Sequence, residues 1–106
     1  MSLNPIAPYN DFQENEGRNY VLRLFVMGAS ANSQKAVVNV KLICDTYLKD
    51  CYSLEIIDVH QQRSLAEKEQ IIALPLLIKS QPSPLGRMIG DMSDTQKVLK
   101  GLGIVI

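Results

Sequence analysis

The feature that most constrains this sequence is a pair of short apolar runs separated by one amphipathic helix. The first run, YVLRLFVM at 20–27, is nearly continuous, as in a strand covered on both faces. The second, LEIIDV at 54–59, has the same character. Between them, apolar residues recur at helical spacing from 36 to 48, and Asn32 or Ser33 is placed to cap this helix, which we expect to reach Lys49. The pattern predicts an α/β fold with a β-α-β unit, whose strands are parallel and whose crossover is right-handed.

The second half of the chain gives weaker and partly conflicting signals. It predicts a charged helix at 61–72, a short strand at 76–79, an edge strand at 87–89 and a last helix through Leu102 that Ser93 or Asp94 caps. In the final stretch, Ile104–Ile106 favours β structure, whereas the glycines at 101 and 103 weaken any regular element.

The overall composition indicates one small domain. We expect a poorly ordered arm at 1–19 and a single folded domain at 20–106. Eleven basic and eleven acidic residues cancel, which argues against nucleic-acid binding and does little to oppose self-association. The N-terminus lacks a secretory signal pattern, and no apolar run approaches the roughly 20 residues of a membrane span. We therefore expect a cytoplasmic protein without a nucleic-acid or membrane partner.

The equipment for catalysis is sparse. His60 is the single histidine, and Cys44 and Cys51 have neither a redox-motif nor a metal-ligand spacing. The loop GASANS at 28–33 contains no thiol for a helix N-terminus to activate, and its serines are better suited to capping. Asp58 and Asp91 follow a strand and a glycine, where aspartates usually accept backbone hydrogen bonds. We expect no enzyme activity, no cofactor and no metal.

Several segments, in order and without large gaps, resemble the KaiB family of cyanobacterial circadian clock proteins and their bacterial relatives. The segments are YVLRLFVMG at 20–28, Asn32-Ser33, Tyr52 followed by LEIIDV at 54–59, LAEKEQIIALP at 65–75, RMIGDMS at 87–93 and KVLKGL at 97–102.

The resemblance implies a non-catalytic interaction protein. Clock members of the family bind the ATPase KaiC, sequester KaiA and compete with a histidine kinase that has its own KaiB-like domain. The family is metamorphic: a tetrameric ground state, which we expect in a crystal, exchanges with a monomeric thioredoxin-like state that binds partners. Both states share the first half, through Val59, and the second half is rebuilt. The residues that the resemblance assigns to this switch are Pro75, Pro82, Pro84, Asp91, Gly101 and Gly103.

The X-Pro bonds at 74–75, 81–82 and 83–84 suggest a further hypothesis. Because isomerisation of such bonds takes tens to hundreds of seconds, it would make the exchange slow. A single conformer in NMR spectra under all conditions would contradict this.

The resemblance also implies a partner-binding face, with Lys35 and Lys79 at its rim. Its residues are Tyr20, Lys35, Tyr52, Ser53, Glu55, Asp58 and Lys79. Core packing with a solvated hydroxyl is an equally good interpretation of the two tyrosines.

The sequence also departs from the clock members. Glu55 replaces a lysine in the surface that meets KaiC, Gly103 replaces an aspartate, Ile106 replaces a tyrosine, and Ala29–Ala31 replace Asn-Thr-Pro. The leading hypothesis is regulation of, or by, a KaiC-like ATPase or sensor histidine kinase, with a homodimer or homotetramer as the oligomer. A homologue outside a true clock, acting as an oligomer in stress response or signalling, is the alternative. A thioredoxin-like redox protein is a remote third.

Overall fold

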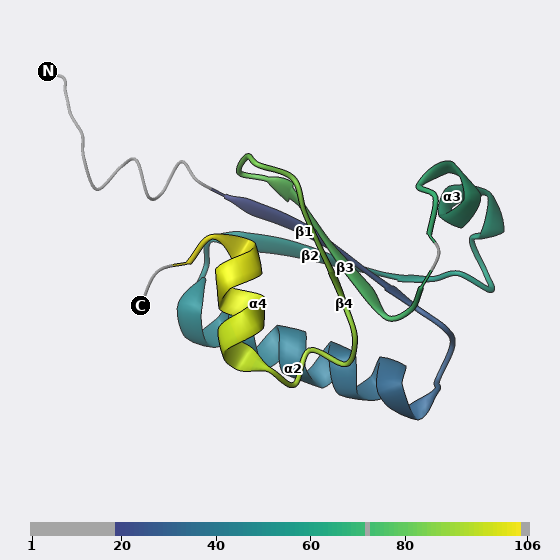
Figure 1. Ribbon diagram of the computed structural model, residues 1–106, viewed down its shortest axis with the longest axis horizontal. Helices are drawn as coiled ribbons and strands as arrows, with labels where there is room; N and C mark the ends of the chain where they lie inside the picture. Colours follow the sequence, from purple (N-terminus) through teal and green to yellow (C-terminus); the bar gives the residue numbers. More distant parts are fainter. Residues whose placement is uncertain (1–18, 72, 105–106) are drawn as a thin grey trace, which may run out of the picture.

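The computed structural model describes residues 19–71 and 73–104, which form one four-stranded sheet with helices on both faces (Figure 1). The elements are β1 (Tyr20–Val26), α2 (Ala31–Tyr47), β2 (Tyr52–Asp58), α3 (Arg63–Lys68), β3 (Leu76–Gln81), β4 (Gly86–Ile89) and α4 (Thr95–Leu102). The strand order is β2-β1-β3-β4. β1 and β2 are parallel, whereas β3 is antiparallel to both of its neighbours. The predicted parallel β-α-β unit is therefore confirmed.

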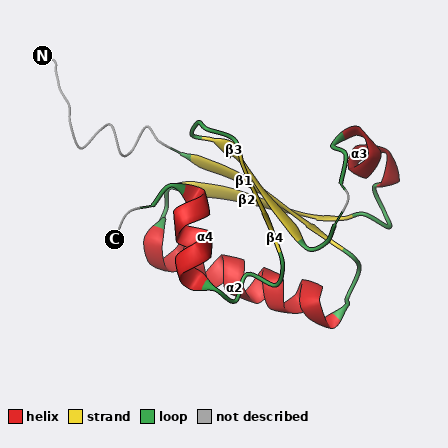
Figure 2. Cartoon of the chain, viewed as in Figure 1, coloured by secondary structure: helices red, strands yellow, loops and turns green. Residues whose placement is uncertain are grey.

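Alternation of side chains along the strands builds two separate apolar clusters. The larger one lies between the sheet and the helices α2 and α4, which share one face (Figure 2). The smaller one lies on the opposite face and consists of Phe25, Ile57, Leu76 and Ile78, with Leu65 of α3 packed against it. Because β1 supplies buried residues to both clusters, its nearly continuous apolar pattern reflects coverage on both faces, as predicted.

The predicted cap of α2, Asn32 or Ser33, is wrong by two or three residues. Ser30 is the N-cap, and its hydroxyl accepts a hydrogen bond from the backbone N–H of Ser33 at 3.2 Å. Ser33 lies in the first turn and is buried, and its own hydroxyl accepts the Met27 backbone N–H at 2.9 Å. The helix ends at Tyr47, before the predicted Lys49.

The elements of the second half match the predicted order. α3 is shorter than the predicted 61–72, because the chain leaves the helix at Glu69 and Gln70 has a left-handed φ of 57°. β3 extends two residues beyond Lys79, and β4 confirms the predicted edge strand. Asp94 caps α4 by accepting the Lys97 N–H at 3.1 Å. Ile104 is not in a strand, and the rest of the predicted C-terminal β segment, like residues 1–18 and Ile72, lies outside the described residues.

The second half of the chain, after Val59, has the thioredoxin-like arrangement in this structure. The sequence led us to expect the family's ground-state arrangement in a crystal. No helix among the described residues is long and apolar enough to cross a membrane.

Candidate functional site

The residues predicted for the partner-binding face do not share one face in this structure. Ser53 and Glu55 are exposed on the side of β2 that faces away from α2 and α4, as the packing of their neighbours Tyr52 and Leu54 against the larger cluster shows. Lys35 is exposed on α2, on the other side of the sheet. The exposed surface of β2 is therefore the part of the predicted face that remains open to a partner.

The two tyrosines lie side by side and are half-buried. Tyr20 and Tyr52 are register partners at the starts of β1 and β2, and both pack against the larger cluster. The Tyr52 hydroxyl donates a hydrogen bond to Asp45 Oδ1 at 2.7 Å. This bond, together with burial and the nearby Asp45 charge, raises the pKa of Tyr52 to about 12. The geometry favours core packing with a bonded hydroxyl for Tyr52.

Asp58 acts as a local acceptor of backbone hydrogen bonds. Its Oδ1 accepts the Gly28 N–H at 3.2 Å and the His60 N–H at 2.9 Å. Gly28 has a φ of 54°, which favours glycine at this position. The carboxylate thus joins the loop after β1 to the end of β2, as the sequence interpretation of this aspartate expects.

Lys79 is not at the rim of an exposed face, which corrects the prediction for this arrangement of the chain. Its side chain lies on the helix side of β3 and is 2% exposed. Nζ donates a hydrogen bond to the Leu102 carbonyl oxygen at 3.3 Å, at the C-terminal end of α4. A cation at this end of a helix also interacts favourably with the helix dipole. Lys79 therefore anchors α4 to the sheet.

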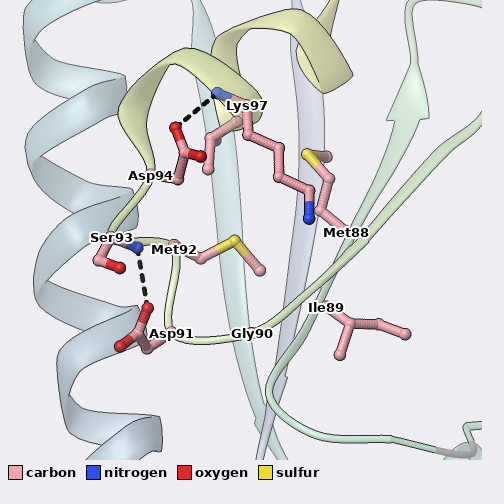
Figure 3. Close-up of a pocket in the computed structure, with 9 residues that line it drawn as sticks. Met88, Ile89, Gly90, Asp91, Met92, Ser93, Asp94 and Lys97 are labelled. Atoms are coloured by element: carbon pink, nitrogen blue, oxygen red, sulfur yellow. Dashed lines mark hydrogen bonds between the residues drawn. The ribbon is translucent and has the colours of Figure 1, made fainter.

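The residues assigned to the fold switch all lie after His60, and three of them lie in α4 or next to its ends. Asp91 accepts the Ser93 N–H at 3.0 Å beside a hollow of about 190 Å³ lined by residues 88–94, 97 and 98 (Figure 3). The Ser93 bond holds the pKa of Asp91 below its usual value. A Cβ on Gly101 would overlap the Met88 side chain, and Gly103 ends α4 with a left-handed φ of 80°. Pro75 precedes β3, while Pro82 and Pro84 lie in the loop before β4.

A cluster of charged side chains that the sequence reasoning missed holds α3 over the sheet. Arg23 of β1 donates from Nη1 to Glu69 Oε2 at 3.2 Å, and Nη2 lies 3.2 Å from Oε1. Arg87 of β4 donates to the Glu69 backbone carbonyl at 3.0 Å. The Arg23 guanidinium carbon also lies 5.5 Å from the Phe25 ring centroid. The sequence feature that could have indicated this cluster is Arg23, a single charged residue inside the apolar run at 20–27.

We expect a small acid-dependent loss of stability from this cluster. The bond from Arg23 and the nearby positive charges hold the pKa of Glu69 below its ordinary 4.5. A group with a depressed pKa stabilises the fold above its unfolded pKa, and this contribution is lost as pH falls through the folded value. Because Glu69 is partly solvated, we expect at most about 1 kcal/mol. Urea unfolding at pH 7 and pH 3.5 should therefore show a smaller acid loss for Glu69→Gln than for wild type. An equal loss would contradict the assignment.

The position of a thioredoxin-type thiol is occupied by the capping Ser30 and the residues after it. Cys44 is buried, which together with the Asp45 charge raises the pKa of its thiol to about 12. A thiol in this state is a poor nucleophile, so the geometry does not support the redox hypothesis for Cys44.

Comparisons with known proteins agree on one family. The model of the KaiB domain matches residues 23–104. The chain is 54% identical over 85 residues to circadian clock protein KaiB3 of Synechocystis sp., covering 80% of this chain and 83% of that protein. It is 43% identical over 88 residues to circadian clock oscillator protein KaiB of Prochlorococcus marinus subsp. pastoris, covering 83% and 82%.

Solved structures extend this comparison. The N-terminal domain of Synechococcus elongatus SasA has a TM-score of 0.66 and 25% identity, covering 97% of this chain and 93% of that one. Mitochondrial thioredoxin 3 from Saccharomyces cerevisiae also has a TM-score of 0.66, at 14% identity, covering 86% and 83%. The second likeness concerns the fold alone.

Proposed function

Because the chain belongs to the KaiB family, we propose that it is a non-catalytic interaction protein that regulates, or is regulated by, a KaiC-like ATPase or a sensor histidine kinase. The observation that carries the proposal is the family match across residues 23–104, together with the structural likeness to the SasA N-terminal domain. The loop before α2 has Ser30 and the residues after it where a thioredoxin has its reactive thiol, and Cys44 is buried. Both features are consistent with a binding role. Such a protein would work in the cytoplasm.

The partner would contact the exposed face of β2. Ser53 and Glu55 are both exposed there, and Glu55 is the register partner of Arg23. Arg23 is already engaged with Glu69, which leaves Glu55 as a charge available to a partner. Tyr20 and Tyr52 pack on the opposite side of the sheet, and Asp58 lies at the end of β2. These residues would position β2 rather than touch the partner through their polar groups.

The test is binding to the KaiC-like ATPase encoded in the same genome, measured by co-elution and by titration. We expect wild type to co-elute, and Glu55→Lys to change the affinity by roughly tenfold or more, because reversing a charge creates a like-charge contact or removes one. Glu55→Gln should have a smaller effect.

Lys68→Glu is a matched control, because it reverses an exposed charge on α3 rather than on β2. If neither the ATPase nor a sensor histidine kinase from the same genome is retained by wild type, the proposal is wrong. If Glu55→Lys and Glu55→Gln both bind the partner as tightly as wild type does, the β2 face is not the contact surface.

A KaiB homologue outside a true clock, acting as an oligomer in stress response or signalling, is the second candidate. The charge of Glu55, in place of the lysine that the family resemblance leads one to expect, favours this candidate. Failure to co-elute with the KaiC-like ATPase would favour this candidate.

We also propose that the second half of the chain exchanges between two arrangements. Support comes from how it is attached to the shared first half. Besides the backbone ladder between β1 and β3, the described polar links that involve side chains are the Arg23–Glu69 pair, the Asn39 amide bond to the Asp91 carbonyl at 2.9 Å and the local bond from the His60 N–H to Asp58. Two packings of one sequence need differ by only a few kcal/mol.

A further inference from the structure

Two methionines line one hollow at the junction of β4 and α4. Met88 belongs to β4 and Met92 to the loop before α4, and their side chains enter the hollow of about 190 Å³ from two sides (Figure 3). Both methionines belong to the larger cluster, in which Val98, Leu99 and Leu102 of α4 are also buried. Two thioether side chains therefore lie beside α4, which together with α2 covers this face of the sheet.

The hollow gives small molecules a route to these side chains. Met88 is 8% exposed and Met92 is 4% exposed, so each is buried by the surrounding protein. The mouth of the hollow is open, because Ile89 and Lys97 line it and are both exposed. A volume of this size holds several molecules as small as water or hydrogen peroxide. An oxidant of that size can therefore reach the two thioethers while the protein stays folded.

Met88 packs against α4 too closely to accept an added atom on that side. A Cβ on Gly101 of α4 would overlap Met88 Sδ and would lie 2.9 Å from Met88 Cγ. Oxidation adds an oxygen to the sulfur and makes the side chain polar. The new oxygen needs a hydrogen-bond donor, whereas the helix residues that share the larger cluster with Met88 are apolar. A sulfoxide at Met88 should therefore weaken the docking of α4.

Met92 responds to oxidation for a second reason. Its φ of 64° lies in the left-handed region, which is unfavourable for a residue with a bulky side chain. Burial of the side chain in the larger cluster offsets this strain. A polar sulfoxide would lose part of that compensation, so the loop that leads into α4 would also be destabilised.

We propose that Met88 and Met92 form an oxidation site, at which a peroxide converts the thioethers to sulfoxides and thereby releases α4 from the sheet. In each step the sulfur lone pair attacks one peroxide oxygen, and the O–O bond breaks. The sulfur gains that oxygen and loses two electrons, and the departing hydroxide takes the proton of the transferred oxygen and leaves as water. The proposal concerns α4 and not the β2 face, so it does not depend on the proposed function.

Treatment of the folded full chain with excess hydrogen peroxide, followed by fragment mass spectrometry, tests access to the site. Every sample carries Cys51→Ser, because the half-buried Cys51 thiol would also consume peroxide. We expect Met27, which is 47% exposed and precedes α2, to gain an oxygen first, and Met88 and Met92 to follow.

The matched variant for the route of oxidation is Phe25→Leu, which destabilises the smaller cluster on the opposite face of the sheet and leaves the hollow intact. We expect Met88 and Met92 to be oxidised at the same rates in this variant. Rates that rise in proportion to its loss of stability would show that these methionines react only after global unfolding, which would overturn the proposed route.

Hydrogen exchange tests the release of α4. We expect amides of α4 to exchange at least tenfold faster in the oxidised protein than in the untreated protein, whereas amides of α2 should change much less. Incubation with methionine sulfoxide reductases specific for both sulfoxide epimers should restore slow exchange.

The resistant variant is Met88→Leu/Met92→Leu, because leucine keeps a similar apolar volume and has no sulfur to oxidise. Its α4 amides should not respond to peroxide. Circular dichroism should first confirm that it is folded, and Met88→Leu alone takes its place otherwise. Met27→Leu is the matched control, since it removes an exposed methionine before α2 and should leave the response of α4 to peroxide unchanged.

Three further results would overturn the proposal. They are methionines 88 and 92 that stay reduced after Met27 is fully oxidised, α4 amides whose exchange does not change when both methionines are oxidised, and a response to peroxide that persists in the resistant variant.

Discussion

Replacement of Phe25 by alanine is expected to lower the free energy of unfolding by about 3–5 kcal/mol, the usual cost of deleting a buried aromatic side chain. Phe25 is completely buried at the centre of the smaller cluster, where Ile57, Leu76 and Ile78 surround it. Its ring also lies beneath the Arg23 guanidinium that holds Glu69. Since domains of this size have a total stability of about 5–15 kcal/mol, the variant should be close to unfolding.

Urea unfolding measures this loss, and hydrogen exchange shows where it acts. Phe25→Leu is the matched control, because it keeps most of the apolar volume and should cost less than about 1.5 kcal/mol. We expect amides of α3 to exchange faster in Phe25→Ala than in Phe25→Leu, because α3 packs on this cluster through Leu65. An alanine variant within about 1 kcal/mol of wild type would show that the cluster does not depend on the ring.

Lys79→Glu is expected to destabilise the docking of α4 by about 3–5 kcal/mol at pH 8, the cost of an uncompensated buried charge. In wild type the buried ammonium faces the Leu102 carbonyl at the C-terminal end of α4. A carboxylate at the same place would face that carbonyl and the negative end of the helix dipole. Taking up a proton relieves this penalty, which makes the loss of stability dependent on pH.

The pH dependence has a definite sign. A buried glutamate with a raised pKa binds its proton more tightly in the folded state, so its penalty grows as pH rises above the unfolded value of about 4.3. Lys79→Gln is the control, since it is neutral and still able to donate to the carbonyl. We expect the stability difference between the two variants, from urea unfolding at pH 5 and pH 8, to widen at the higher pH. A difference that does not change with pH would show that residue 79 is solvated.

The sheet and its helices could be predicted in large part from local patterns. The apolar run at 20–27 is short and nearly continuous, as expected for a strand buried on both faces, and the stripe along α2 has the period of a helix buried on one face. The edge strand β4 and the Asp94 cap were found in the same way. The Ser30 cap was missed because three candidate side chains, at 30, 32 and 33, stand together in one turn. Only the backbone path decides which of them reaches an unpaired N–H.

The candidate site was harder to predict, and Lys79 and Glu55 show why. Both are charged residues in strands, and a strand alternates its side chains between two faces, so only the partner strands and helices decide which face is covered. β3 presents Lys79 to the side on which α4 lies, and β2 presents Glu55 to the side that α2 and α4 leave open. The predicted partner face was therefore divided between the two sides of the sheet.

The sequence by itself determined the β-α-β unit, the order of the elements after it, the lack of a thiol at the loop before α2, and the family. These follow from spacing along the chain, which local backbone geometry converts directly into structure. Only the tertiary structure decided that Arg23 holds Glu69 and that Lys79 anchors α4. Each of these depends on contacts between residues far apart in the chain, and strand register and helix docking, rather than period, bring such residues together.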